Sequence, residues 1–322
     1  MSDMPETFRS KAPLFEPIIP AVELDFPPHG GRASTHRILH DPCRSHKVEL
    51  LDVEGLTHPL AGAQDAPYQI FRAIPKGPAP ADGWPVLYML DGNAAFDFLS
   101  ADLLASAPGL VLIGIGQRTQ QQFDRSARAR DLIFPDTEAG TDTVRIGAPD
   151  SAGAQPQPLH GAPDFVPLLL NGLRQQAEAG LAINPEKRTL WGHSIAGLFV
   201  LRLMMAHPAS FARFAAISPS LWHNPEQFGR ALESALVGTL DAADGNQPTR
   251  PRIPLYLASG NREKRTKSAG PVPTDAPAAY HALVAQLGQT AGVAVSHQVY
   301  DGAIHIASLP TSLAPVLRFA TI

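Results

Sequence analysis

Residues 189–198, TLWGHSIAGL, decide the fold. An apolar strand runs into a serine flanked by small residues, and an apolar helix begins directly after it. A tight strand-to-helix turn of this kind presents the hydroxyl at its tip and places a backbone N–H behind it, where an oxyanion can form. We expect Gly192 to be glycine because a side chain there would collide with the neighbouring strand. Ser194 is therefore the candidate nucleophile.

The turn departs from the G-x-S-x-G pattern at one position. Ala196 stands where the second glycine is usual, and Gly197 follows one place later. Because alanine fits a helical backbone, the substitution weakens the motif without breaking it. The alternative interpretation is a serine that only caps a helix.

A serine is a weak nucleophile unless a base takes its proton. In hydrolases with this turn, the base follows the final strand. Residues 299–305, VYDGAIH, supply a strand, a tight turn and then His305. His297 is the other late candidate, but it falls in the middle of the strand. We therefore predict His305 as the base.

The carboxylate that orients the base should follow the strand expected at 253–258. Glu263 is the only carboxylate between that strand and Asp275. Its neighbours Arg262 and Lys264 leave a solvated surface charge as an equal alternative. A Ser–His dyad without a carboxylate also stays open.

Two backbone N–H groups are expected to hold the oxyanion. One is that of Ile195, directly after the nucleophile, and the other is that of Asn93 in the Leu90–Asn93 turn. Gly92 would let the chain turn sharply there, although Asp-Gly is also a common turn dipeptide.

The rest of the chain alternates between short apolar runs and helical patterns. Such alternation predicts a single α/β domain, with a mostly parallel twisted sheet covered by helices on both faces. The first two strands should pair antiparallel. We expect strands at 47–53, 68–74, 84–90, 110–115, 188–192, 213–217, 253–258 and 293–300, and helices at 94–106, 165–180, 195–206, 225–239, 276–290 and 310–320.

Two segments lack such a pattern. Residues 1–45 are rich in Pro, His and Gly and are predicted to form an arm or capping segment on a catalytic domain of residues 46–322. Residues 136–163 are predicted to form a long surface loop, which in compact domains is a functional lid or a mobile segment.

Composition narrows the function classes. The chain has 322 residues, a formal net charge of -4 and only 17% charged residues, without a lysine or arginine tract, so nucleic acid is not an expected partner. No apolar run reaches the length of a membrane helix or a signal-peptide core. The single cysteine, Cys43, excludes an intramolecular disulfide. We expect a cytoplasmic protein, and the sequence does not indicate its oligomeric state.

One cluster has spacings that a zinc site could use. His36, His40, Cys43 and His46 lie close in sequence, but no C-x-x-C or H-E-x-x-H core accompanies them. We therefore do not predict a metal site in this cluster.

Several stretches in serial order resemble the esterase D-like family of α/β-hydrolases, and within it the trilactone siderophore esterases of enterobactin and salmochelin type. They are VLYMLDGN at 86–93, RARD at 128–131, RTLWGHS at 188–194, AISPSLW at 216–222 and the turn at 301–305. The resemblance covers roughly residues 45–320 and implies the α/β-hydrolase fold and ester hydrolysis through an acyl-enzyme, without a cofactor.

The resemblance also implies two substrate contacts. In the siderophore branch an arginine after the fourth strand helps to hold the anionic catecholate, and Arg130 is the matching position. A guanidinium can pair with and hydrogen-bond such an anion. Trp222 could stack on an aromatic acyl group. The alternatives are a solvated loop charge for Arg130 and structural packing for Trp222.

These features lead to one main hypothesis, a serine esterase that opens the ester backbone of a catecholate siderophore. A general short-chain carboxylesterase or an S-formylglutathione-like thioester hydrolase is the alternative within catalysis. A non-catalytic binding protein on the hydrolase fold is the alternative of another class.

Overall fold

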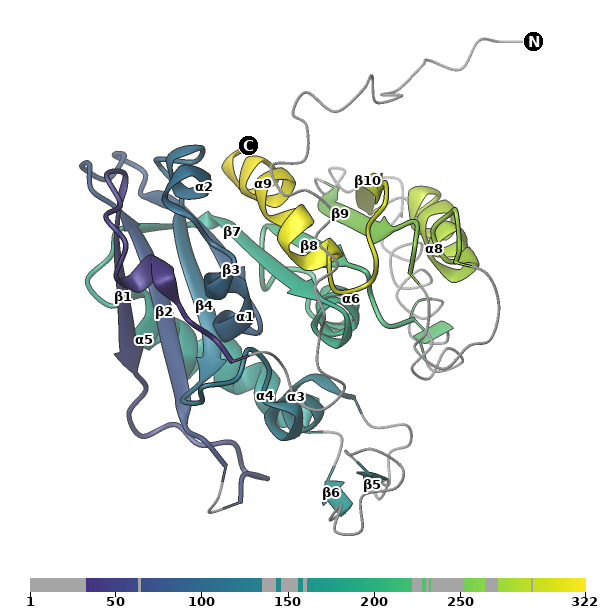
Figure 1. Cartoon of the computed structure of the whole chain (residues 1–322), viewed down its shortest axis with the longest axis horizontal. Helices are drawn as coiled ribbons and strands as arrows, with labels where there is room; N and C mark the ends of the chain where they lie inside the picture. Colours follow the sequence, from purple (N-terminus) through teal and green to yellow (C-terminus); the bar gives the residue numbers. More distant parts are fainter. Residues whose placement is uncertain are drawn as a thin grey trace, which may run out of the picture.

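An eight-stranded sheet forms the centre of the protein in a computed structural model (Figure 1). The structure describes residues 33–62, 65–134, 161–221, 228–229, 232, 252–263, 272–290 and 292–322, and the backbone of 143–145 and 156–158. All eight strands expected from the sequence are present in it. They are β1 His46–Asp52, β2 Tyr68–Pro75, β3 Trp84–Met89, β4 Val111–Gln117, β7 Ile183–His193, β8 Arg213–Ile217, β9 Ile253–Gly260 and β10 Val293–Tyr300.

The strand order is β1-β2-β4-β3-β7-β8-β9-β10. β1 pairs antiparallel with β2, and β2 pairs antiparallel with β4. From β4 to β10 every pairing is parallel. Because parallel strands end at one edge, the residues that follow β3, β7, β8, β9 and β10 meet there.

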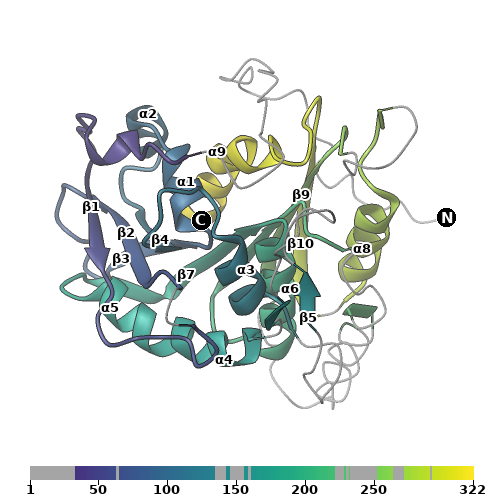
Figure 2. The same ribbon diagram turned by 60° about the horizontal axis from the view of Figure 1, so that its bottom comes forward.

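Helices cover both faces of the sheet, as expected (Figures 1 and 2). α1, α2 and α9 lie on one face, and α4, α5, α6 and α8 lie on the other (Figure 2). The helical segments are α1 Gly92–Asp97, α2 Ala101–Ala105, α3 Arg125–Leu132, α4 Ala162–Pro167, the π-helical η2 Leu168–Leu173, α5 Arg174–Glu178, α6 Ile195–Ala206, α8 Ala278–Gly288, α9 Ser308–Thr321 and the short 3₁₀ turn η1 Arg37–Leu39.

The central strands are apolar along their length because both of their faces are buried. In β3, Val86 and Tyr88 pack into the layer that contains α6, whereas Leu87 and Met89 pack into the layer that contains α9. This two-residue alternation is a property of the extended backbone. Because both layers are apolar, every residue of the strand is hydrophobic and the sequence shows no alternation.

Three helical expectations need correction. The helix expected at 94–106 is divided into α1 and α2, because Ser100 adopts an extended conformation and caps α2 by accepting from the Leu103 N–H. The helix expected at 165–180 begins earlier, at Ala162, and contains a π-helical segment after Pro167, which lacks a backbone N–H. α3 was not expected, although Asp124 caps it by accepting from the Ala127 N–H.

The segments outside the regular pattern are described only in part. Within 136–163 the structure gives a short antiparallel pair, β5 Thr143–Arg145 and β6 Pro156–Pro158, where a loop alone was expected. The helix expected at 225–239 lies almost wholly outside the described residues. Of the arm, Ile38 and Cys43 are buried in the layer that contains α1, but the division of the chain at residue 45 stays a prediction.

None of the helices in the described parts of the chain combines the length and the apolar character that a membrane span requires.

The two-sided burial of the sheet gives a direct test. Leu112 in β4 is fully buried, so Leu112→Ala should lower the free energy of unfolding by about 2–5 kcal/mol through lost transfer energy and a residual cavity. Leu50→Ala, in the edge strand β1 where the side chain is 41% exposed, is the matched control and should cost well under half as much. Urea denaturation of both variants measures the difference, and equal losses would contradict the burial pattern.

Candidate active site

Ser194 lies between β7 and α6 in a strained conformation. Its φ of 62° and ψ of -119° are rarely adopted by a residue with a side chain. The Ser194 N–H donates to the carbonyl of Ile217 on β8 at 2.9 Å, which holds the turn against the sheet edge. Backbone strain that is fixed by surrounding contacts is typical of functional sites.

The small residues around Ser194 are required by close packing. A Cβ at Gly192 would lie 2.4 Å from the Ala196 carbonyl oxygen, so the expected collision with the neighbouring strand is wrong: the obstacle is the first turn of α6. A Cβ at Gly197 would lie 2.9 Å from the Ile217 carbonyl oxygen. Gly197 therefore allows α6 to approach β8, and Ala196 is accommodated in the buried side of the helix.

A chain of hydrogen bonds links Ser194, His305 and Glu263. His305 Nε2 lies 2.9 Å from Ser194 Oγ, and His305 Nδ1 lies 2.9 Å from Glu263 Oε2. Because an ionised carboxylate only accepts, Nδ1 carries the proton and Nε2 is free to accept from the serine hydroxyl. The arrangement can move a proton from Ser194 to His305. His297, the competing histidine, lies within β10.

Glu263 is a buried acceptor rather than a solvated surface charge. Its side chain is only 10% exposed. One carboxylate oxygen accepts from Ser218 Oγ, from Ser259 Oγ at 3.1 Å and from the Gly260 N–H at 2.8 Å. Burial alone would raise the pKa of Glu263. The hydrogen bond from His305, the charge of His305 and the hydrogen bonds from Ser218 and Gly260 have the opposite and larger effect, so the pKa of Glu263 is lowered to about 2.

The loops that carry the carboxylate and the histidine are fastened together. Asn261 donates to Asp301 at 2.7 Å and accepts from the Gly302 N–H at 2.8 Å. A Cβ at Gly260 would lie 2.1 Å from the Ala303 carbonyl oxygen, so only glycine allows the two loops this close. Their separation is therefore fixed by the Asn261 side chain and by close backbone packing at Gly260.

The turn after β3 places Asn93 at the same edge of the sheet. The left-handed residue in this turn is Asp91, with φ 53°, and Gly92, which was expected to let the chain turn sharply, is the first residue of α1. Gly92 is needed because a Cβ there would lie 2.7 Å from the backbone of Gly114 in β4. The Asn93 side chain bonds both the N–H and the carbonyl of Gln117 at 3.0 Å, which anchors the turn to the end of β4.

Arg130 does not present a free guanidinium. Its side chain is 4% exposed, and it donates to Asp131 at 2.6 Å and to Asp65 at 2.5 Å. It is therefore not the solvated loop charge of the alternative interpretation. Trp222 lies outside the described residues.

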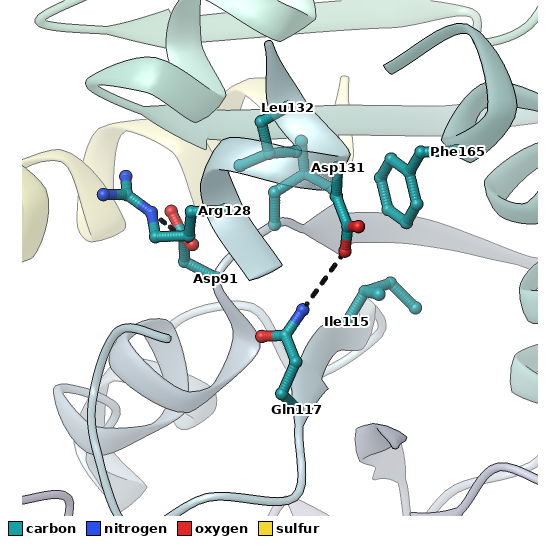
Figure 3. A pocket seen from close by; sticks show the side chains of 8 residues that line it. Asp91, Ile115, Gln117, Arg128, Asp131, Leu132 and Phe165 are labelled. Atoms are coloured by element: carbon teal, nitrogen blue, oxygen red, sulfur yellow. Dashed lines mark hydrogen bonds and ion pairs between the residues drawn. The ribbon is translucent and has the colours of Figure 1, made fainter. Parts of the chain in front are cut away.

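Arg128 lies in the same helix, α3, and lines a small cavity (Figure 3). The cavity measures about 10 Å³, close to the space of one water molecule, and lies between the ends of β3 and β4 and α3. Arg128 Nε donates to Asp91 Oδ1 at 2.8 Å. Arg128 Nη2 and Asp91 Oδ2 are buried and have no partner among the residues that the structure describes.

Several polar residues at the site were not singled out from the sequence. Ser220 Oγ lies 3.1 Å from Ser194 Oγ, and Ser218 contacts Glu263. Both lie in the quoted stretch AISPSLW, but a serine after a strand carries no signal of its partner. Ser308 and the ring of His193 also lie beside the His305 backbone.

The residues of the suggested zinc cluster have other contacts. His36 Nε2 lies 3.1 Å from the Asn93 carbonyl oxygen, and His46 Nε2 lies 3.0 Å from that of Leu110. Within the described ranges, no three His, Cys, Asp or Glu side chains gather in a way that could hold a metal ion.

A mostly parallel sheet with a strand–serine–helix turn, and a histidine and a carboxylate after later strands, defines an α/β-hydrolase. The protein is an ester hydrolase of the serine-hydrolase type. It belongs to the family described as "Putative esterase", whose model matches residues 63–315.

Known proteins similar to this chain agree with that class. Ferri-bacillibactin esterase BesA of Bacillus subtilis is 30% identical over 263 residues, covering 79% of this chain and 84% of that protein. Apo-salmochelin esterase of Escherichia coli is 35% identical over 157 residues, covering 48% of this chain and 47% of that protein. The BES protein structure from Bacillus cereus matches with a TM-score of 0.64 and 26% identity, over 85% of this chain and 96% of that one.

The lowered pKa of Glu263 predicts a pH-dependent stability. Because the folded pKa of about 2 lies below the ordinary 4.5, ionised Glu263 stabilises the fold above about pH 4.5, and this contribution is lost as the pH falls towards 2. Wild type should exceed Glu263→Gln in free energy of unfolding by up to about 3 kcal/mol at neutral pH, with the gap closing between about pH 4.5 and 2. Denaturant titrations at several pH values measure this gap.

The exposed variant Glu186→Gln controls for the loss of one negative charge. A gap between wild type and Glu263→Gln that stays constant from neutral pH to pH 2 would show that Glu263 is not held ionised by its partners.

Proposed function

We propose that this protein hydrolyses carboxylic esters through an acyl-enzyme, with Ser194 as nucleophile, His305 as general base and Glu263 as the orienting acid. The observation that carries the proposal is the hydrogen-bond chain from Ser194 through His305 to Glu263. It supports a triad rather than a Ser–His dyad.

The proton path follows from the two histidine contacts. As Ser194 Oγ attacks the ester carbonyl carbon, its proton passes to His305 Nε2, and Glu263 stabilises the imidazolium through Nδ1. When the tetrahedral intermediate collapses, Nε2 gives this proton to the leaving alcohol. Water then attacks the acyl-enzyme by the same path and releases the acid and Ser194.

The oxyanion is proposed to bind the N–H groups of Ile195 and Asn93. These residues lie in the first turns of α6 and α1, where backbone N–H groups have no acceptor within the helix. Charge that develops at two such donors is stabilised without reorganisation of the site.

The proposed substrate is the ester backbone of a catecholate siderophore. Relatives whose names refer to bacillibactin, salmochelin and enterobactin support this substrate class. A catecholate is an anion. The Arg128 side chain is 18% exposed and has one carboxylate partner, Asp91, whereas the Arg130 side chain is 4% exposed and has two. We therefore propose Arg128 as the guanidinium that meets the substrate anion. Stacking by Trp222 and a cytoplasmic location stay predictions from the sequence.

Removal of the nucleophile tests the reaction. Ser194→Ala should lower kcat/KM on p-nitrophenyl esters and on a catecholate trilactone by at least about 10³-fold, because the acyl-enzyme cannot form. Ser106→Ala, an exposed serine at the end of α2, is the control and should match wild type. A Ser194→Ala protein with wild-type turnover would contradict the proposal, and an inactive wild type would favour the binding-protein alternative.

Comparison of substrates tests the anion contact. Arg128→Gln should lower kcat/KM for an anionic catecholate ester about tenfold more than for a neutral p-nitrophenyl ester, since only the former loses a charge-assisted hydrogen bond. Equal losses on both substrates would remove Arg128 from the substrate site. Higher wild-type activity on simple acyl esters or S-formylglutathione than on the trilactone would favour the general esterase.

A further inference from the structure

A second set of polar side chains lies behind the base and ends on the same carboxylate. His193 Nε2 lies 3.1 Å from Ser308 Oγ, which lies 2.6 Å from Ser218 Oγ, and Ser218 Oγ donates to Glu263 Oε1. All three residues are at most 2% exposed. They come from the ends of β7 and β8 and the start of α9.

This second chain also reaches the backbone of the base. The His305 carbonyl oxygen lies 2.9 Å from His193 Nε2 and 2.6 Å from Ser308 Oγ. The centroids of the His193 and His305 imidazole rings are 5.0 Å apart. The same two residues, His305 and Glu263, are therefore joined directly through Nδ1 and a second time through Ser308 and Ser218.

The number of available protons limits how these contacts can be made. Ser218 must donate to Glu263, because the ionised carboxylate can only accept. The proton of Ser218 is then committed, so the single hydroxyl proton of Ser308 is shared between the His305 carbonyl oxygen and Ser218 Oγ, each 2.6 Å from Ser308 Oγ. The Nε2–H of His193 is left to serve the His305 carbonyl and Ser308 Oγ. Ser308 thus connects the hydroxyl that binds Glu263 with the backbone of His305, and neighbouring hydrogen bonds in such a network polarise one another.

His193 is suited to remain a neutral donor. Burial and the charge of His305 lower the pKa of His193 to about 3. Its Nδ1 is buried without a partner among the described residues, as expected for an imidazole whose single proton is on Nε2. The charged or titratable groups that act on His193 are His305, Glu263 and Arg128. Tyr280, from α8, also interacts with Glu263.

The backbone at Ser218 is strained, and this strain positions the hydroxyl for its hydrogen bond to Glu263. Its φ is 43°, in the left-handed region, and its N–H donates to the Ala258 carbonyl at 2.7 Å. A non-glycine residue in this conformation costs free energy that surrounding contacts must offset. Here the conformation brings the hydroxyl to Glu263.

We propose that His193, Ser308 and Ser218 form a relay of positioning residues that fixes Glu263 and the His305 backbone relative to each other. The relay rests on the proposed function, because it acts through the base and its acid; the side-chain partners of Ser194 Oγ in the described part of the chain are His305 and Ser220. Its effect on the base follows from electrostatics. A hydroxyl bound to Glu263 disperses the carboxylate charge, so its removal makes the carboxylate attract a proton on His305 more strongly.

The test compares two buried serines one helical turn apart in α9. Ser308→Ala removes a relay hydroxyl, whereas Ser312→Ala removes a hydroxyl that accepts from Trp191 Nε1 outside the relay. Both side chains are fully buried, so the two variants control for structural cost. Ser218→Gly is a second relay variant, because glycine tolerates the positive φ and lacks the hydroxyl.

Two readouts are measured on the full chain. The first is the midpoint of the His305 titration, followed by NMR of the imidazole resonances, which requires no turnover. The second is the acid limb of the kcat/KM profile on a p-nitrophenyl ester. In Ser308→Ala both should move up by about a few tenths of a pH unit relative to Ser312→Ala, and kcat should fall about 2- to 12-fold with KM unchanged. Ser218→Gly should show a larger shift.

A His305 midpoint in Ser308→Ala and Ser218→Gly that equals that of Ser312→Ala overturns the relay, whatever happens to kcat. Failure of the proposed function is a different result: a wild type that hydrolyses no ester while its His305 titration still responds to Ser308→Ala.

Discussion

The contact between His305 Nε2 and Ser194 Oγ depends on nearly every other feature of the fold. The two residues are 111 positions apart in the chain, and they meet because β7 and β10 are parallel and end at one edge of the same sheet. Each is then fixed locally. Ser194 is held by its strained turn, and His305 by a loop that is bonded to the loop of Glu263. The parallel topology brings Ser194 and His305 to the same edge of the sheet, and close backbone packing fixes the distance between them.

Glycines determine how near these loops approach. Gly192, Gly197 and Gly260 have no room for a Cβ because backbone atoms of other segments occupy the space. In each case the neighbour is main chain, which cannot rotate away as a long side chain could. The replacement of the usual glycine by Ala196 is tolerated because the close approach to β8 occurs at Gly197. The geometry of the site therefore depends on having glycine wherever the backbone of another segment comes close, more than on an exact match to the G-x-S-x-G pattern.

Prediction from the sequence succeeded where the signal was periodic and local. The apolar runs gave the central strands, since burial on both faces leaves a uniform hydrophobic pattern. The edge strands β1 and β10 are buried only in part and were expected from mixed apolar and polar segments. Ser194 and His305 followed from the order of elements along the chain, and the structure brings them together with Glu263. The contacts of Ser218 and Ser308 could not be predicted, because both are single serines whose partners come from other strands. The burial of Arg130 depends on Asp65, 65 positions away. Charge alone did not distinguish it from Arg128, which lines the cavity.

The measurement that tests the account most directly is covalent labelling with a fluorophosphonate, followed by mass spectrometry of the digested protein. The account predicts a single adduct on Ser194, formed rapidly in wild type and at least about 10³-fold more slowly in His305→Ala, because the imidazole must accept the proton of the serine. An unlabelled protein, an adduct on another residue, or labelling that does not depend on His305 would contradict it.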